Sequence, residues 1–95
     1  AALPAKQPAV IYDNLGIASY MLGDKVAALH YFRHAYLADP NSIEVLNNLG
    51  SILHEMGEPV EALIYLDRAI QLSPAYCEPH LEALTIMRTL GDPEG

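Results

Sequence analysis

Apolar residues recur every three or four positions along most of this chain, which is the spacing of one face of an α-helix. Short groups of glycine, proline, aspartate and serine interrupt the pattern, and these residues end, turn or cap helices. The pattern therefore predicts five helices and no strand. Their approximate ranges are 8–22, 25–38, 43–56, 59–72 and 78–90. Residues 1–7 lack the pattern and are expected to form a tail or linker.

The same pattern returns after 34 residues. Residues 9–42 align with residues 43–76 without a gap, and ten positions are identical. The identical pairs are Asn14/Asn48, Leu15/Leu49, Gly16/Gly50, Gly23/Gly57, Val26/Val60, Ala28/Ala62, Leu29/Leu63, Tyr31/Tyr65, Ala35/Ala69 and Pro40/Pro74. A repeat of this length indicates a solenoid of stacked units more often than a single closed core.

Each copy carries a large residue three positions before Leu-Gly, and then small residues and a proline at fixed spacing. The first copy has Tyr12, Leu15, Gly16, Ala28, Phe32, Ala35 and Pro40, and the second has Leu46, Leu49, Gly50, Ala62, Leu66, Ala69 and Pro74. This spacing resembles the tetratricopeptide repeat (TPR), a helix–turn–helix unit of this length. The resemblance implies an all-α fold of antiparallel helix–turn–helix repeats stacked as a right-handed solenoid. It also implies a protein–protein interaction module, a scaffold rather than an enzyme.

The repeats divide the chain into a tail at 1–7, a first repeat at 8–42, a second at 43–76 and a remainder at 77–95. The remainder matches the first helix of a third repeat, or it is a capping helix. Gly16 and Gly50 should let the helices of a repeat approach closely, facing Ala28 and Ala62. Leu84 stands at the matching position of the third copy. Either no partner helix packs there, or the third hairpin is splayed.

The first helix of each repeat has two stripes at helical spacing. One stripe should face the second helix and form the core, which is predicted to contain Tyr12, Leu15, Gly16, Ser19, Leu22, Leu46, Leu49, Gly50, Leu53 and Met56. The second helices should add Ala28, Leu29, Phe32, Ala35, Ala62, Leu63, Leu66 and Ala69.

The other stripe lies in a concave groove if the chain follows the TPR plan, in which first helices line the concave side. The predicted peptide-binding residues on it are Asp13, Asn14, Ile17, Tyr20, Glu44, Asn47, Asn48, Ser51, His54, Glu55, Glu78 and Glu82. Five of these are acidic, whereas the only cation on the stripe is Arg88. An acidic groove favours a protein or peptide partner with basic residues.

Asn14 and Asn48 lie one repeat apart on this stripe. They resemble the asparagine ladder of O-linked N-acetylglucosamine transferase superhelices, whose amides hold a peptide backbone. An asparagine amide both donates and accepts hydrogen bonds, so it can bind a peptide unit of any sequence. The alternative is that each asparagine braces a neighbouring helix.

The formal net charge of −7 argues against a nucleic acid or an anionic membrane as partner, because phosphate binding needs clustered lysine and arginine. The acidic side chains could equally keep a repeat protein in solution. Cys77 is the only cysteine, so no internal disulfide can form. A lone cysteine fits the cytoplasm, although export stays open. No apolar run approaches the ~20 residues of a membrane span.

Catalytic, metal and cofactor sites are not predicted. His30 and His34 have a spacing that can hold zinc, but a third ligand is missing beside them. Ser19 and Ser51 lack a base that would activate a nucleophile. Two alternatives to a peptide-binding module stay open. One is an assembly unit that associates through the open repeat ends, at residues 9–22 and 77–90, and the other is the substrate-docking arm of an enzyme.

Overall fold

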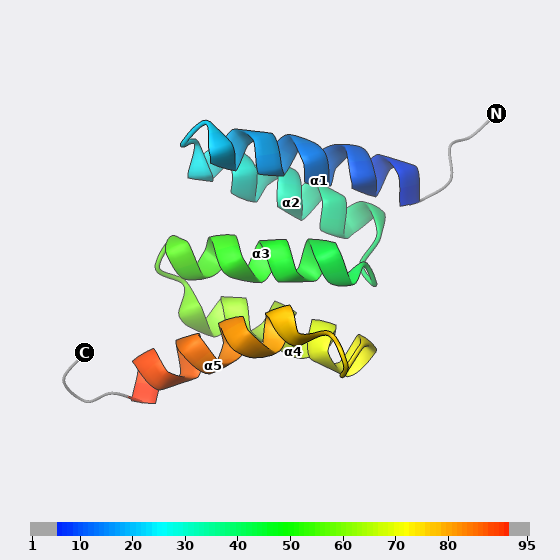
Figure 1. The fold of residues 1–95 in the computed structure, drawn as a ribbon. Coiled ribbons are helices and arrows are strands. Elements are labelled where there is room, and N and C mark those ends of the chain that lie inside the picture. Colours follow the sequence, from blue (N-terminus) through cyan, green and yellow to red (C-terminus); the bar gives the residue numbers. More distant parts are fainter. Residues whose placement is uncertain (1–5, 92–95) are drawn as a thin grey trace.

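The computed structural model describes residues 6–91, which form five helices and no strand (Figure 1). The helices are α1 (Lys6–Met21), α2 (Lys25–Ala38), α3 (Ile43–Glu55), α4 (Pro59–Leu72) and α5 (Cys77–Gly91). The predicted all-α fold is confirmed. α1 begins at Lys6, two residues before the predicted start, and α5 is one residue longer at each end than predicted.

The helix boundaries follow from local capping. The Asp24 carboxylate accepts a hydrogen bond from the Ala27 backbone N–H at 3.0 Å and so caps α2, and the Ser42 hydroxyl caps α3 in the same way. Gly23 and Gly57 follow α1 and α3 with φ angles of 85° and 83°. In this left-handed conformation the chain can reverse, because glycine has no Cβ to clash.

The helices form two antiparallel hairpins, α1–α2 and α3–α4, and α5 packs on the second hairpin (Figure 1). α1 lies at one end of the stack and α5 at the other. The main hydrophobic core joins α2, α3, α4 and α5, and it consists of Ala28, Phe32, Leu49, Ile52, Leu53, Ala62, Leu66, Ala83 and Ile86. α3 is thus the central helix of the molecule.

Part of the predicted core stripe is exposed. In α3 the residues Leu46, Leu49 and Leu53 are fully buried, as predicted. In the first copy, however, Leu15 is 41% exposed and Leu22 is 86% exposed, and Met56 at the end of α3 is 36% exposed. Leu15 is exposed because α1 is the first helix of the stack. α2 covers the matching face of α3, whereas within residues 6–91 no helix covers that face of α1.

Gly16 and Gly50, which occupy the same position in the two repeats, allow the helices of each repeat to approach closely. The residues that they face differ from those predicted. A Cβ built on Gly16 would lie 2.5 Å from the Phe32 ring, and one on Gly50 would lie 2.5 Å from Leu66. The nearest contacts of the missing side chains are therefore these two large residues rather than Ala28 and Ala62.

Candidate functional site

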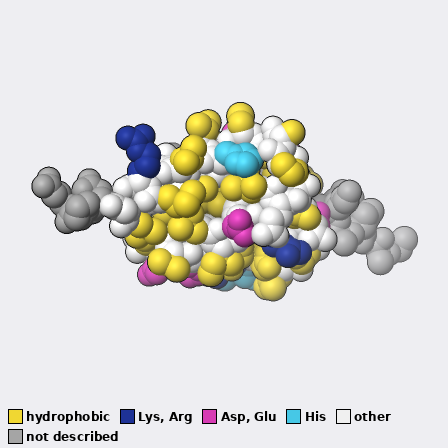
Figure 2. Space-filling model, turned by 90° about the horizontal axis from the view of Figure 1, so that it is seen from below, with side chains coloured by type: hydrophobic (Ala, Val, Ile, Leu, Met, Phe, Trp, Pro, Cys, Tyr) yellow, Lys and Arg dark blue, Asp and Glu magenta, His cyan; other side chains and the backbone are white. Residues whose placement is uncertain are grey.

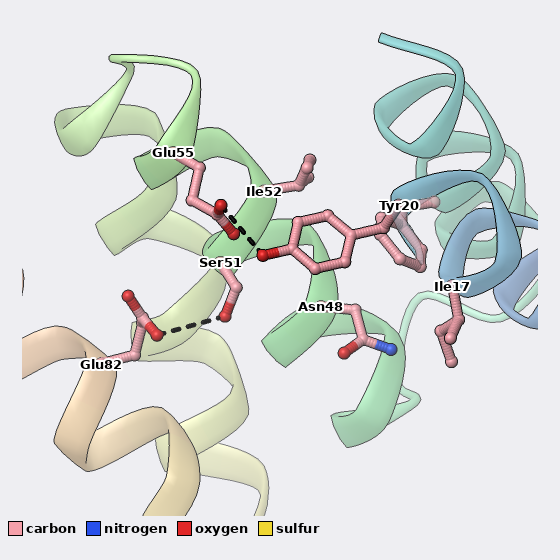
Figure 3. Close-up of a pocket in the computed structure, with 8 residues that line it drawn as sticks. Ile17, Tyr20, Asn48, Ser51, Ile52, Glu55 and Glu82 are labelled. Atoms are coloured by element: carbon pink, nitrogen blue, oxygen red, sulfur yellow. Dashed lines mark hydrogen bonds between the residues drawn. The ribbon is translucent and has the colours of Figure 1, made fainter. Parts of the chain in front are cut away.

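The stripe that was predicted to bind a peptide lines two neighbouring hollows along α3. The first hollow lies between α1 and α3 and has a volume of about 450 Å³ (Figure 3). Its lining residues are Ile17, Tyr20, Phe32, Asn48, Ser51, Ile52, Glu55 and Glu82. The second lies between α3 and α5, has a volume of about 350 Å³, and is lined by Asn47, Ser51, Glu78, Leu81, Glu82 and Thr85. Ser51 and Glu82 line both hollows, so the two are contiguous.

Three other predicted site residues lie apart from these hollows. Asp13, Asn14 and Glu44 line a separate hollow of about 480 Å³, formed by the first half of α1 and the turn between α2 and α3. His54 lines neither of the two hollows along α3, but its ring contacts Glu82. The structure thus brings eight of the twelve predicted residues together along α3 and places the remaining four around them.

Hydrogen bonds tie α3 to α1 at and beside the first hollow. The Asn48 amide donates to the Asp13 carboxylate at 2.9 Å. The Tyr20 hydroxyl donates to Glu55 at 3.0 Å (Figure 3). Lys25 Nζ lies 3.5 Å from the same Glu55 carboxylate. Asn48 therefore braces a neighbouring helix, the alternative role considered from the sequence. Asn14 is exposed.

A second set of hydrogen bonds ties α3 to α5. The Asn47 amide donates to Glu78 at 3.2 Å, and the Ser51 hydroxyl donates to Glu82 at 3.3 Å. His54 Nδ1 lies 2.8 Å from the other oxygen of the Glu82 carboxylate. Because an ionised carboxylate only accepts hydrogen bonds, Nδ1 is the nitrogen that donates here.

Two of the site residues have shifted pKa values. Asp13 is 7% exposed, and desolvation by burial raises the pKa of its carboxyl; the nearby charge of Glu44 adds to this, while the hydrogen bond from Asn48 opposes it. The hydrogen bond to Glu55 is the largest cause that raises the pKa of the Tyr20 phenol, because the carboxylate stabilises the protonated form.

The two hollows along α3 are negatively charged. Their charged lining residues are Glu55, Glu78 and Glu82, all acidic. The floor of the first hollow is apolar and includes Phe32 and Ile52. The helical pattern predicts Phe32 in the core, and Ile52 lies on neither of the two predicted stripes. A repeat-by-repeat pattern cannot show which core edges stay open to a groove, because that depends on how far α1 and α3 separate.

In the described part of the chain, His30, His34 and Cys77 do not form a metal site. The rings of His30 and His34 lie 4.3 Å apart, and His34 Nδ1 is 2.9 Å from the His30 backbone oxygen. Between residues 6 and 91, no three His, Cys, Asp or Glu side chains are grouped so that they could hold a metal ion. Cys77 is exposed. None of the five helices is long and apolar enough to span a membrane.

Part of the chain matches a known protein family. The family model described as tetratricopeptide repeat matches residues 43–76, the second of the two copies. Among curated proteins, none matches the sequence.

Proposed function

We propose that this chain binds an extended peptide with basic side chains in the groove along α3. Residues 43–76 match the tetratricopeptide repeat model, and repeats of that family are generally protein–protein interaction modules. The observation that carries the proposal is the combination of an apolar floor and acidic walls in the two contiguous hollows. Apolar hollows and acidic patches are each common on protein surfaces, but an apolar floor beside acidic walls suits a long basic side chain.

The first hollow suits a lysine or an arginine. Ile17 and the Tyr20 ring offer exposed apolar surface, and the nearly buried Phe32 and Ile52 form the floor. Glu55 and Glu82 also line the hollow (Figure 3). Lysine and arginine bury an apolar stem while the charged head stays in a polar environment. Such a side chain would contact the apolar floor with its methylene groups and place its cation between the two carboxylates.

The internal hydrogen bonds leave capacity for a ligand. A carboxylate offers about four lone-pair sites, and Glu82 accepts two hydrogen bonds in this structure. The contact between Lys25 and Glu55 is solvent-exposed, and such pairs contribute only ~0–1 kcal/mol, so a ligand cation can replace it at little cost. The amide nitrogen of Asn48 is turned toward α1 while its oxygen faces away, so the oxygen can accept a peptide N–H (Figure 3).

The test is selection of a displayed library of random peptides on the parent chain, followed by calorimetric titration of a selected peptide. We expect the selected sequences to be rich in lysine and arginine and their affinity to fall as salt is added. The double variant Glu55→Gln with Glu82→Gln should weaken binding by roughly tenfold or more, since hydrogen bonds to charged groups are worth ~1.5–3 kcal/mol.

The matched control is Glu58→Gln with Asp67→Asn, which removes the same charge from exposed positions outside both hollows. It should change affinity by less than about twofold, because screened surface charges act weakly at a distance. Asn14→Ala tests the exposed asparagine, whereas Asn48→Ala would also remove the donor to buried Asp13 and so mix binding with stability. Equal loss in the groove and control variants would contradict the proposed site.

A further inference from the structure

The outer face of α1 is a helix surface without charge. All the exposed side chains between Val10 and Leu22 are uncharged, and only Asn14, together with the Tyr20 hydroxyl, is polar. Helices that are apolar nearly all round are usually covered on more than one side. In this structure α2 covers one side of α1, and the side that faces away from the stack is open.

One stripe on this face has the spacing of a helix–helix seam. Ile11, Leu15, Ala18 and Leu22 are separated by four, three and four residues, which keeps them on one side of the helix over three turns. The first three are exposed, yet the matching residues of α3 (Val45, Leu49 and Ile52) are buried. These positions therefore favour contact with another helix, and in the second repeat they have one.

We propose that the stripe of Ile11, Leu15, Ala18 and Leu22 is the contact surface for a second copy of this chain, with the two α1 helices antiparallel about a two-fold axis. An axis midway between Leu15 and Ala18 sets Leu15 of each copy opposite Ala18 of the other, a large residue against a small one. The same axis sets Ile11 opposite Leu22 of the second copy. The stripe is thus complementary to itself, as a two-fold interface requires.

Charge favours a second copy at this face over other faces. Two chains that each carry a net charge of −7 repel one another, and this repulsion is weakest where they meet at a surface that brings no like charges into contact. The opposite end of the stack, seen in Figure 2, also shows many hydrophobic side chains, but both acidic and basic side chains lie among them. The exposed side chains of α1 from Val10 to Leu22 are uncharged, so a contact at this face places no like charges directly against one another.

This contact uses a different side of α1 from the groove, to which Ile17 and Tyr20 belong. Dimerisation therefore does not depend on the proposed peptide binding. One pair of short helices buries less surface than the ~1,600 Å² of a standard interface, so the dimer should be weak. We expect a dissociation constant in the range of roughly micromolar to millimolar.

Sedimentation equilibrium over a wide range of protein concentration tests the proposal. The parent chain should pass from monomer to dimer, and Leu15→Glu and Ala18→Glu should each raise the dissociation constant roughly tenfold or more, because they place a charge in an apolar seam. Ala18 is exposed in the monomer, so its variant keeps the fold intact, as circular dichroism would verify. The matched control is Leu84→Glu, a similarly exposed leucine at the opposite end of the stack, which should leave dimerisation unchanged.

Disulfide formation checks the antiparallel register, in a Cys77→Ser background that removes the exposed native thiol. A mixture of the Leu15→Cys and Ala18→Cys variants should form the mixed disulfide faster than either variant forms its own. A parent chain that stays monomeric, or a dimer lost in Leu84→Glu and kept in Ala18→Glu, would overturn the proposal. A parent that stays monomeric and binds a peptide of residues 25–38, with binding lost in Leu15→Glu, would also overturn it. The stripe on α1 would then bind a helix of the α2 type and not a second α1.

Discussion

At the scale of single residues, Asp13 shows how a buried carboxyl affects stability. Its folded-state pKa is raised above the usual value near 3.8. The protonated form is therefore favoured in the folded state, and its stabilising contribution is complete below the unfolded pKa. That contribution is lost as the pH rises through the folded pKa, so at neutral pH the ionised carboxylate is buried at a cost.

Asp13→Asn should accordingly raise the free energy of unfolding at pH 7, because it removes the buried charge while an amide oxygen can still accept from Asn48. The second copy has Asn47 at this position. The advantage should shrink as the pH falls below the folded pKa of Asp13, where the parent carboxyl is neutral. Urea unfolding at a series of pH values measures this, with exposed Asp67→Asn as control. A variant less stable than the parent at pH 7 would mean that the hydrogen bond to the carboxylate outweighs its desolvation.

Gly50 is where a single methyl group should disturb the fold. A Cβ there would lie 2.5 Å from Leu66, a fully buried core residue with little room to move. Overpacking in Gly50→Ala should cost about 1–3 kcal/mol, and the better helix propensity of alanine should return ~1 kcal/mol, so the free energy of unfolding should fall by about 0–2 kcal/mol. Gly91→Ala serves as control, because a Cβ there meets open space. A Gly50→Ala variant more stable than the parent in thermal unfolding would show that α3 and α4 can separate without cost.

At the scale of helices, truncating the motif leucine should cost more stability in α3 than in α1. Leu49 is 0% exposed, and Leu49→Ala should cost about 2–5 kcal/mol of the ~5–15 kcal/mol expected for a domain of this size. Leu15 has the matching position in α1 but is 41% exposed, so Leu15→Ala should cost roughly 1–2 kcal/mol. Urea unfolding of both variants, at concentrations where the chain is monomeric, measures the difference. Equal costs would mean that α1 is covered in solution.

Helix ends were predictable because capping is local. The side chains of Asp24 and Ser42 bond to backbone groups three residues away, and glycine after α1 and α3 can take the left-handed conformation without strain. Burial was less predictable, because it depends on the next helix rather than on the residue itself. Leu15 and Leu49 are identical in type and motif position, yet only the second is covered.

At the scale of the whole molecule, the groove could be predicted in outline but not in its contacts. The helical period placed eight of the predicted residues along the two hollows, since residues on one stripe must share a face. Their hydrogen-bond partners depend on the offset between stacked helices, which differs along the stack. The bond from Asn48 to Asp13 spans 35 residues, whereas the bond from Asn47 to Glu78 spans 31. A fixed repeat of 34 residues contains no information about this change.

Leu84 has a consequence for how this architecture can be extended. Its side chain occupies the motif position where Gly50 leaves room for Leu66, so a hairpin partner cannot approach α5 as closely as α4 approaches α3. Additional copies of residues 43–76 could be spliced in ahead of α5, where the last copy would meet α5 through the contact that α4 already makes with it. A copy joined after α5 would meet a leucine instead of a gap. The chain is therefore modular on one side of α5 and closed to regular growth on the other.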